Sequence, residues 1–82
     1  MIEPHLTKRN AALRTNLFKI NDLTEREKEV LLHWVVDDYN YKEIASILTI
    51  SKNTVRTHLQ NINKKLNVSS KTMLIIMILS NV

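Results

Sequence analysis

Residues 51–66 read SKNTVRTHLQNINKKL, and their apolar side chains recur at the spacing of an α-helix. At 3.6 residues per turn, positions i, i+4, i+7 and i+11 share one stripe, and here they hold Val55, Leu59, Ile62 and Leu66. Ser51 precedes this stripe, where its hydroxyl can accept a hydrogen bond from a free backbone N–H of the first turn. The pattern predicts a helix that begins near Lys52 and packs one face on a core.

The opposite face of this predicted helix carries side chains that offer a hydrogen bond or a positive charge, and none of them is acidic. They are Asn53, Arg56, Thr57, Gln60 and Lys64. A polar to basic surface of this kind favours a polyanion such as DNA as its ligand.

The composition fits one small domain. The 82 residues are 44% apolar with only four aromatic side chains, so we expect a single core built mainly from Leu, Ile and Val. The chain has no cysteine, which suits a reducing compartment. Its first ten residues lack the features of a secretory signal, and no apolar run approaches the roughly 18 residues that span a bilayer. We therefore expect a soluble, cytoplasmic protein without membrane contact.

The charges are distributed unevenly along the chain. All eight acidic residues lie in residues 1–43, where seven Lys and Arg leave a net charge of −1, whereas residues 44–82 carry five bases and no acid. Such asymmetry concentrates positive potential where phosphates could dock. A solvated basic surface would explain the charge alone equally well. The helical phase of the bases within residues 51–66 favours phosphate docking.

Two shorter helices are predicted upstream. Thr24 and Glu27 form an S/T-x-x-E capping box, which starts a helix that should run to about Asp37. Asn40 can cap a second helix over residues 41–48. A turn at residues 49–51 then leads into the helix described first. Two short helices, a tight turn and a second helix with a polar face are typical of a helix-turn-helix.

A last helix is predicted over residues 71–80, after Asn67 closes the preceding one in a left-handed conformation. Its seven consecutive apolar residues, 73–79, cover the whole circumference of a helix, yet so small a domain can bury only one side. We expect the other side to meet a second subunit, in a two-fold dimer that places two copies of the polar-faced helix roughly 34 Å apart. Alternatively, the N-terminal segment covers this surface within the same chain.

Residues 1–22 form an arm or linker in this interpretation. Their loose pattern of Leu6, Leu13, Leu17, Phe18 and Ile20 predicts a short amphipathic helix from about Thr7 to Lys19. This segment could be a linker, a lid on the domain, a partner-binding helix or an arm packed on its own domain. Residues 23–82 form the predicted helix-turn-helix domain.

The combination of LTEREKEVL (23–31), KEIA (42–45), L-x-IS-x-x-TVR-x-H (48–58) and NI-x-KKLNV (61–68) resembles the LuxR/GerE type of bacterial DNA-binding domain, also found in NarL-like response regulators. The resemblance covers about residues 23–80. It implies an all-α, four-helix helix-turn-helix domain, here with an N-terminal arm or short extra helix. It also implies a recognition helix in the major groove and dimerisation through the last helix.

The resemblance implies roles for individual residues. The positions similar to the family's base readers are Arg56, Thr57 and Gln60, and this agrees with their chemistry, because Arg pairs with guanine, Gln with adenine, and the Thr methyl with that of thymine. Phosphate contacts are expected from Lys52, Asn53, Thr54, Lys64 and Lys65. The expected dimer interface comprises Met73, Ile76, Met77 and Ser80. Double-stranded DNA and a second copy of the chain are the expected partners, with RNA polymerase as a further candidate.

Alternatives come from other classes of protein. The loop DDYNY (37–41) and the following YKEIA are also similar to region four of a sigma factor, although that region usually ends after the recognition helix. A helix-turn-helix that docks on an acidic protein partner is a second alternative. An enzyme is disfavoured, because no glycine is available for a phosphate loop, no cysteine for a nucleophile, and the three histidines lie far apart in sequence. We expect no catalytic residue, metal or cofactor, and His33 should be a packed or surface imidazole.

Overall fold

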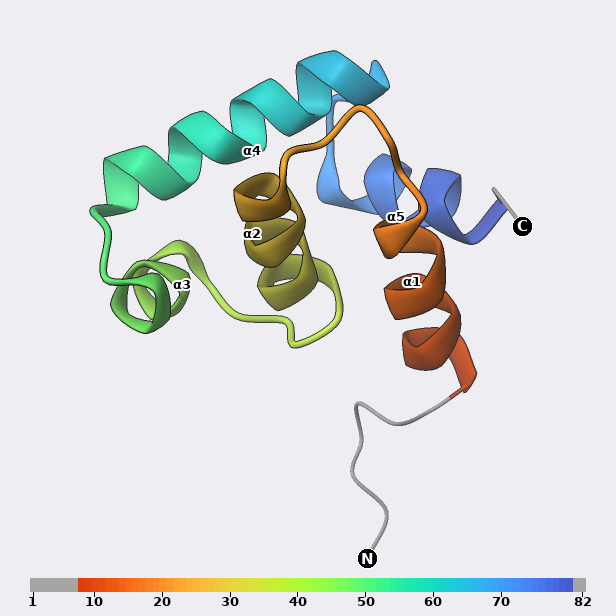
Figure 1. Ribbon diagram of the computed structural model, residues 1–82, viewed down its shortest axis with the longest axis horizontal. Helices are drawn as coiled ribbons and strands as arrows, with labels where there is room; N and C mark the ends of the chain where they lie inside the picture. The colour runs from red at the N-terminus through yellow and green to blue at the C-terminus, as the bar shows by residue number, and fades with distance from the viewer. Residues whose placement is uncertain (1–7, 81–82) are drawn as a thin grey trace, which may run out of the picture.

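The computed structural model describes residues 8–80, which fold into five α-helices with no β-strand among them (Figure 1). The helices are α1 (Lys8–Phe18), α2 (Glu25–Val35), α3 (Tyr41–Leu48), α4 (Lys52–Leu66) and α5 (Lys71–Ser80). The all-α, helix-turn-helix prediction is therefore confirmed, with the short extra helix at the N-terminus. Leu6 and Thr7, where that helix was expected to begin, lie outside the described residues. No helix in this described part is long and apolar enough to cross a bilayer.

Side chains cap the helices at the predicted places. Thr24 accepts a hydrogen bond from the Glu27 backbone N–H at 3.1 Å, and the Glu27 carboxylate accepts one from the Thr24 backbone N–H at 2.9 Å. Asn40 and Glu43 form the same reciprocal box at the start of α3. Ser51 accepts from the Thr54 N–H at 3.0 Å and starts α4. These caps satisfy N–H groups that have no partner within their own helix.

Three of the described residues adopt the left-handed conformation, in a chain that has no glycine. Asp38, Thr49 and Asn67 have φ angles of 57°, 57° and 56°. Thr49 and Asn67 are the C-caps of α3 and α4, and the N–H of each reaches back to carbonyls of its own helix. Asn67 closes α4 as predicted. α2 ends at Val35 rather than near Asp37, because the chain turns at this point and Asp38 leaves the helical conformation.

α4 lies across α2 and α3, and this crossing contains the centre of the core (Figure 1). Val55, Leu59 and Ile62 on the inner stripe of α4 are 0–2% exposed. α2 contributes Val30 and Leu31 to the same core, both completely buried. The predicted inner stripe of α4 is thus confirmed, apart from Leu66, which is half-buried.

α1 and α5 lie side by side and extend the core on the far side of α2 (Figure 1). Leu13 and Leu17 of α1 and Leu74 and Ile78 of α5 are fully buried. The buried Asn16 side chain donates a hydrogen bond to the Ile78 carbonyl at 2.9 Å. The N-terminal helix therefore covers one side of α5 within the same chain.

The junction of α1 and α2 has an exposed aromatic side chain and a half-buried lysine. Phe18, which belongs to the apolar pattern of residues 1–22, is 52% exposed. Lys28 on α2 is half-buried and donates to the Phe18 carbonyl at 3.3 Å. The end of α1 lies over this lysine, because Ile20 and Leu23, which follow Phe18, are the residues that enter the core.

Candidate nucleic-acid interface

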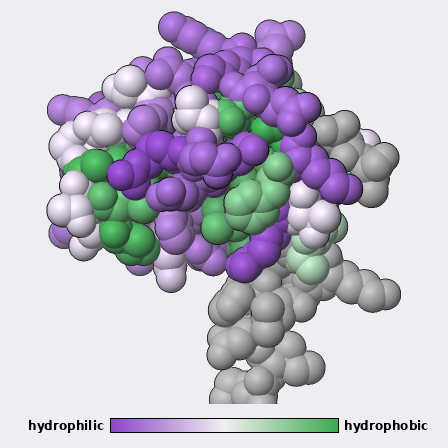
Figure 2. Space-filling model, viewed as in Figure 1, coloured by the Kyte–Doolittle hydropathy of each residue, from purple (hydrophilic) through white to green (hydrophobic). Residues whose placement is uncertain are grey.

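The outward face of α4 presents Arg56, Thr57 and Gln60 to solvent. The buried stripe of Val55 and Leu59 fixes the rotation of the helix, so these three side chains are held on its other side. α4 carries four Lys and Arg and no acid. Hydrophilic side chains cover the surface along α4 (Figure 2).

Most of the predicted phosphate contacts lie on the same exposed surface. Lys52, Asn53 and Thr54 form the first turn of α4, and all three are exposed, as is Lys64 in its last turn. The hydroxyl groups of Thr54 and Ser51 are hydrogen-bonded to each other at 2.9 Å. The backbone N–H groups of a helix N-terminus favour anions, so the first turn of α4 suits a phosphate.

Lys65 does not join this group. Its Nζ lies 2.7 Å from Oε1 of Glu27, at the start of α2. Burial alone would raise the pKa of Glu27, but hydrogen bonds from Lys65 and from the Thr24 backbone, with the positive charge of Lys65, outweigh burial and lower that pKa. Lys65 therefore ties α4 to α2, and the sequence offered no sign of a partner 38 residues away.

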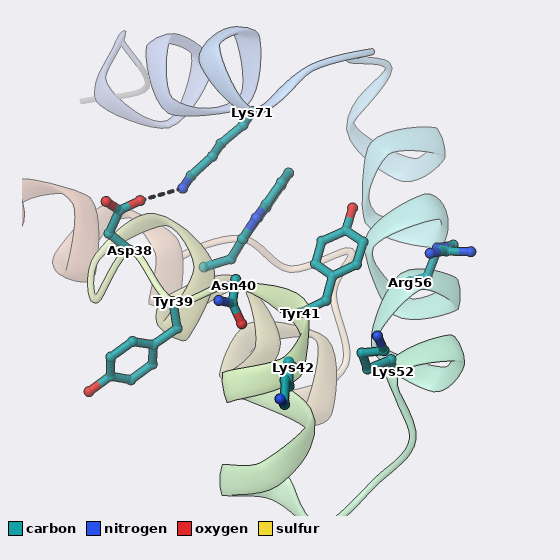
Figure 3. A pocket seen from close by; sticks show the side chains of 9 residues that line it. Asp38, Tyr39, Asn40, Tyr41, Lys42, Lys52, Arg56 and Lys71 are labelled. Carbon is teal, nitrogen blue, oxygen red and sulfur yellow. Dashed lines mark hydrogen bonds and ion pairs between the residues drawn. The ribbon is translucent and has the colours of Figure 1, made fainter.

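An open hollow of about 440 Å³ lies beside the outward face of α4 (Figure 3). Lys52 and Arg56 line it from α4, and the Arg56 guanidinium lies 6.0 Å from the centre of the Tyr41 ring. Across the hollow, Lys71 lies 5.4 Å from the Trp34 ring and 2.6 Å from an Asp38 carboxylate oxygen. Sequence reasoning did not place Tyr41 or Lys71 near the candidate interface, because they belong to neighbouring helices and no periodicity links them to α4.

The second predicted interface, on α5, keeps an apolar surface. Met73 and Ile76 are 47% and 60% exposed, although Leu74 and Ile78 face the core. Met77 is half-buried, and Ser80 is exposed with its hydroxyl donating to the Met77 carbonyl at 3.1 Å. α1 therefore leaves this side of α5 open.

His33 has a local structural role. Its Nδ1 lies 2.9 Å from a carboxylate oxygen of Asp37, one turn further along the chain, and its ring stacks on Tyr39 at 5.9 Å. Within residues 8–80, no three His, Asp or Glu side chains are grouped as a metal ion would require.

Comparison with known proteins places these features in a family. The model of the luxR family of bacterial regulatory proteins matches residues 21–78, which include α2 to α4 and most of α5. The nitrate/nitrite response regulator protein NarP of Escherichia coli K12 is 49% identical over 49 residues, which are 60% of this chain and 22% of NarP. No solved structure gives a significant match.

Two further relatives carry other regulatory names. The regulatory protein SdiA of E. coli K12 is 45% identical over 51 residues, 62% of this chain and 21% of SdiA. The response regulator protein VraR of Staphylococcus aureus is 43% identical over 63 residues, 77% of this chain and 29% of VraR. The matched segment is thus less than a third of each of these relatives. The chain belongs to the luxR family of bacterial regulatory proteins, whose helix-turn-helix domains bind DNA.

Proposed function

We propose that this chain is a sequence-specific regulator of transcription that acts in the cytoplasm by placing α4 in the major groove of double-stranded DNA. The observation that carries the proposal is the exposed, acid-free face of α4, fixed in orientation by the buried residues behind it. A major groove about 12 Å wide admits one α-helix, and such a helix needs an outer face that can bond to base edges and phosphates.

The exposed side chains of α4 have two roles in DNA binding, since some contact bases and others contact phosphates. Arg56 suits guanine O6 and N7, Gln60 suits adenine N6 and N7, and the Thr57 methyl suits the methyl of thymine. Around them, phosphate contacts come from Lys52, Asn53, Thr54, Lys64 and Lys65, and these position the domain without reading sequence. To contact a phosphate, Lys65 has to break its ion pair with Glu27 or bind both groups at once.

We further propose that two copies bind together through α5. The open apolar side of this helix, with Ile76 at 60% exposed, supports the pairing. A two-fold dimer presents one recognition helix to each half of a symmetric site, with the half-sites roughly 34 Å apart.

Replacement of Arg56 by Ala tests base recognition. The variant should lose about 1 to 3 kcal/mol on the preferred site and discriminate less at one position, because the paired hydrogen bonds to one base are gone. The preferred site comes from selection of bound duplexes from a random pool, and affinities come from titrations of that site and of single-base variants.

Lys64→Ala is the matched control, since it removes one exposed cation from the same helix. It should weaken binding to all sequences alike and reduce the slope of log affinity against log salt by about 0.9. Equal loss of specificity in both variants would contradict base reading by Arg56. A wild-type salt slope near zero would contradict DNA binding itself.

A second candidate function is docking on a protein partner such as RNA polymerase. The observation in its favour is Ile47 on α3, which is 49% exposed and lines an open hollow with Glu43 and Ser46. A stable complex with a protein, together with failure to retard any duplex at low salt, would favour this function. An asymmetric selected DNA consensus would instead favour the sigma-like mode of promoter binding.

A further inference from the structure

The hollow beside α4 is rich in positive charge. Its basic side chains come from three different helices: Lys42, Lys52, Arg56 and Lys71. Asp38 is the one acidic side chain among its lining residues. Aromatic rings lie under two of the bases, Tyr41 under Arg56 and Trp34 under Lys71. Surface lysines normally project freely into water, whereas the Lys71 ammonium lies over the Trp34 ring at the hollow.

We propose that this hollow receives a phosphate of the DNA strand that borders the groove entered by α4, with Lys71 as its direct contact. The proposal rests on the proposed function, since it extends the DNA footprint beyond α4. It assigns a DNA contact to Lys71, a residue that the sequence pattern did not single out.

The position of the hollow relative to α4 supports this assignment. An α-helix with its side chains is about 10 to 12 Å across and nearly fills a major groove about 12 Å wide. The strands that border the groove must then pass beside the helix, over its neighbours in the fold. Because Lys52 and Arg56 belong both to the exposed face of α4 and to the rim of the hollow, the hollow opens next to that face (Figure 3).

The present partner of Lys71 is one that a phosphate can replace. Lys71 Nζ lies 2.6 Å from Asp38, whose side chain is 85% exposed, and such an ion pair in water is weak. Figure 3 shows Lys71 extending from the start of α5 to Asp38, with Tyr41 between this pair and α4. When DNA docks, Lys71 exchanges the carboxylate for a phosphate oxygen, and Asp38 opposes binding through its negative charge.

The test uses the full chain and a random-sequence duplex of roughly two helical turns, about 20 base pairs. Lys71→Met keeps a long unbranched side chain and removes the charge. The slope of log affinity against log salt should become shallower by about 0.9, the contribution of one phosphate contact. Arg14→Met is the control, since it removes an exposed cation from α1, which packs on α2 and α5. The control should keep the wild-type slope.

Asp38→Asn gives an independent result. Asn tolerates the left-handed conformation that Asp38 has at φ 57°, so the loop should keep its shape. This variant should bind the same duplex more tightly than wild type. If Lys71 only anchors the loop, Asp38→Asn should bind no better than wild type, and that result overturns the proposal even if Lys71→Met does not fold.

Absence of DNA binding and absence of a phosphate site in the hollow would give different results. A wild-type chain that binds no duplex at low salt refutes the proposed function. A wild-type chain that binds, with an unchanged salt slope in folded Lys71→Met, refutes only the phosphate site in the hollow. Helical content measured by circular dichroism identifies which variants are folded.

Discussion

Thr49 holds the least favourable backbone conformation described in this chain. Its φ of 57° and ψ of 48° lie in the left-handed region, where a β-branched side chain crowds the backbone. Asn67 and Asp38 share this region, but their side chains tolerate it better. The turn of the helix-turn-helix is thus closed at an energetic cost that glycine would avoid.

Thr49→Gly should therefore stabilise the domain by about 0.5 to 1 kcal/mol. Relief of the left-handed penalty, about 1 to 2 kcal/mol, outweighs the greater entropy of glycine in the unfolded chain. Urea unfolding at neutral pH measures the change. Thr49→Ala is the control, since it keeps a Cβ and should gain less. A Gly variant about 1 kcal/mol less stable than wild type would contradict a left-handed penalty at Thr49.

For single residues, prediction from sequence succeeded where the physical cause was local. Ser51, Thr24 and Asn40 were placed correctly because a cap acts within three residues of its own position. Asn67 was placed correctly because few residues can replace glycine at a helix end. The left-handed Thr49 was not foreseen, since nothing about threonine itself favours that conformation.

Among the elements, α2 and α4 are joined by the ion pair of Glu27 and Lys65. Glu27 is 4% exposed and is also part of the capping box that starts α2. Its Oε1 atom accepts hydrogen bonds from both the Thr24 backbone N–H and the Lys65 ammonium. One charge therefore stabilises both the beginning of α2 and its contact with α4.

The Glu27 carboxylate should make the free energy of unfolding depend on pH. Its pKa is lowered in the folded state from an ordinary value of 4.5, so the unfolded chain binds the proton more readily. The contribution of ionised Glu27 to the free energy of unfolding is present above pH 4.5 and is lost as the pH falls below that value. Glu27→Gln should cost about 1 to 2 kcal/mol near neutral pH, and its difference from wild type should narrow in acid.

Unfolding by urea at a series of pH values measures this difference. Glu25→Gln is the matched control, because it removes the same charge from an exposed position in the first turn of α2. The control should differ little from wild type at any pH. If Glu27→Gln and wild type lose stability in parallel as the pH falls, the pair does not contribute as described.

At the element scale, the limits of sequence reasoning have a clear physical origin. The exposed face of α4 could be predicted because helical periodicity alone separates Arg56 and Gln60 from the buried stripe. The contact of Lys65 with Glu27 could not, because it joins residues 38 positions apart and depends on how α4 packs on α2. The hollow formed by Tyr41, Arg56 and Lys71 likewise exists only once the helices have packed.

For the whole molecule, the packing of α1 on α5 determines which surface remains for a partner. α1 buries Leu74 and Ile78, and it leaves Met73 and Ile76 exposed. The sequence supported both a covered and a dimerising α5, since it showed only that the helix is apolar all round. The fold supplies the cover on one side, while pairing through the other side stays a prediction, as does the boundary between arm and domain at residue 22.

Ile76→Glu should weaken self-association. Each of two interface isoleucines would lose about 1 kcal/mol or more of apolar burial, so the dimer dissociation constant should rise about 30-fold or more. Sedimentation velocity across a range of concentrations, with and without DNA, measures it. Phe18→Glu is the control, because Phe18 is a comparably exposed apolar residue on α1. Pairing through α5 is contradicted if the wild-type chain stays monomeric even on DNA. It is also contradicted if Ile76→Glu and Phe18→Glu weaken self-association equally.

The hydrogen bond from Asn16 to the Ile78 carbonyl also bears on how the chain is synthesised. These residues are 62 positions apart, so α1 is synthesised well before its partner helix. Until α5 has been synthesised and has left the ribosome, the apolar side of α1 lacks this partner. The contact between α1 and α5 is therefore the last of the helix contacts to form.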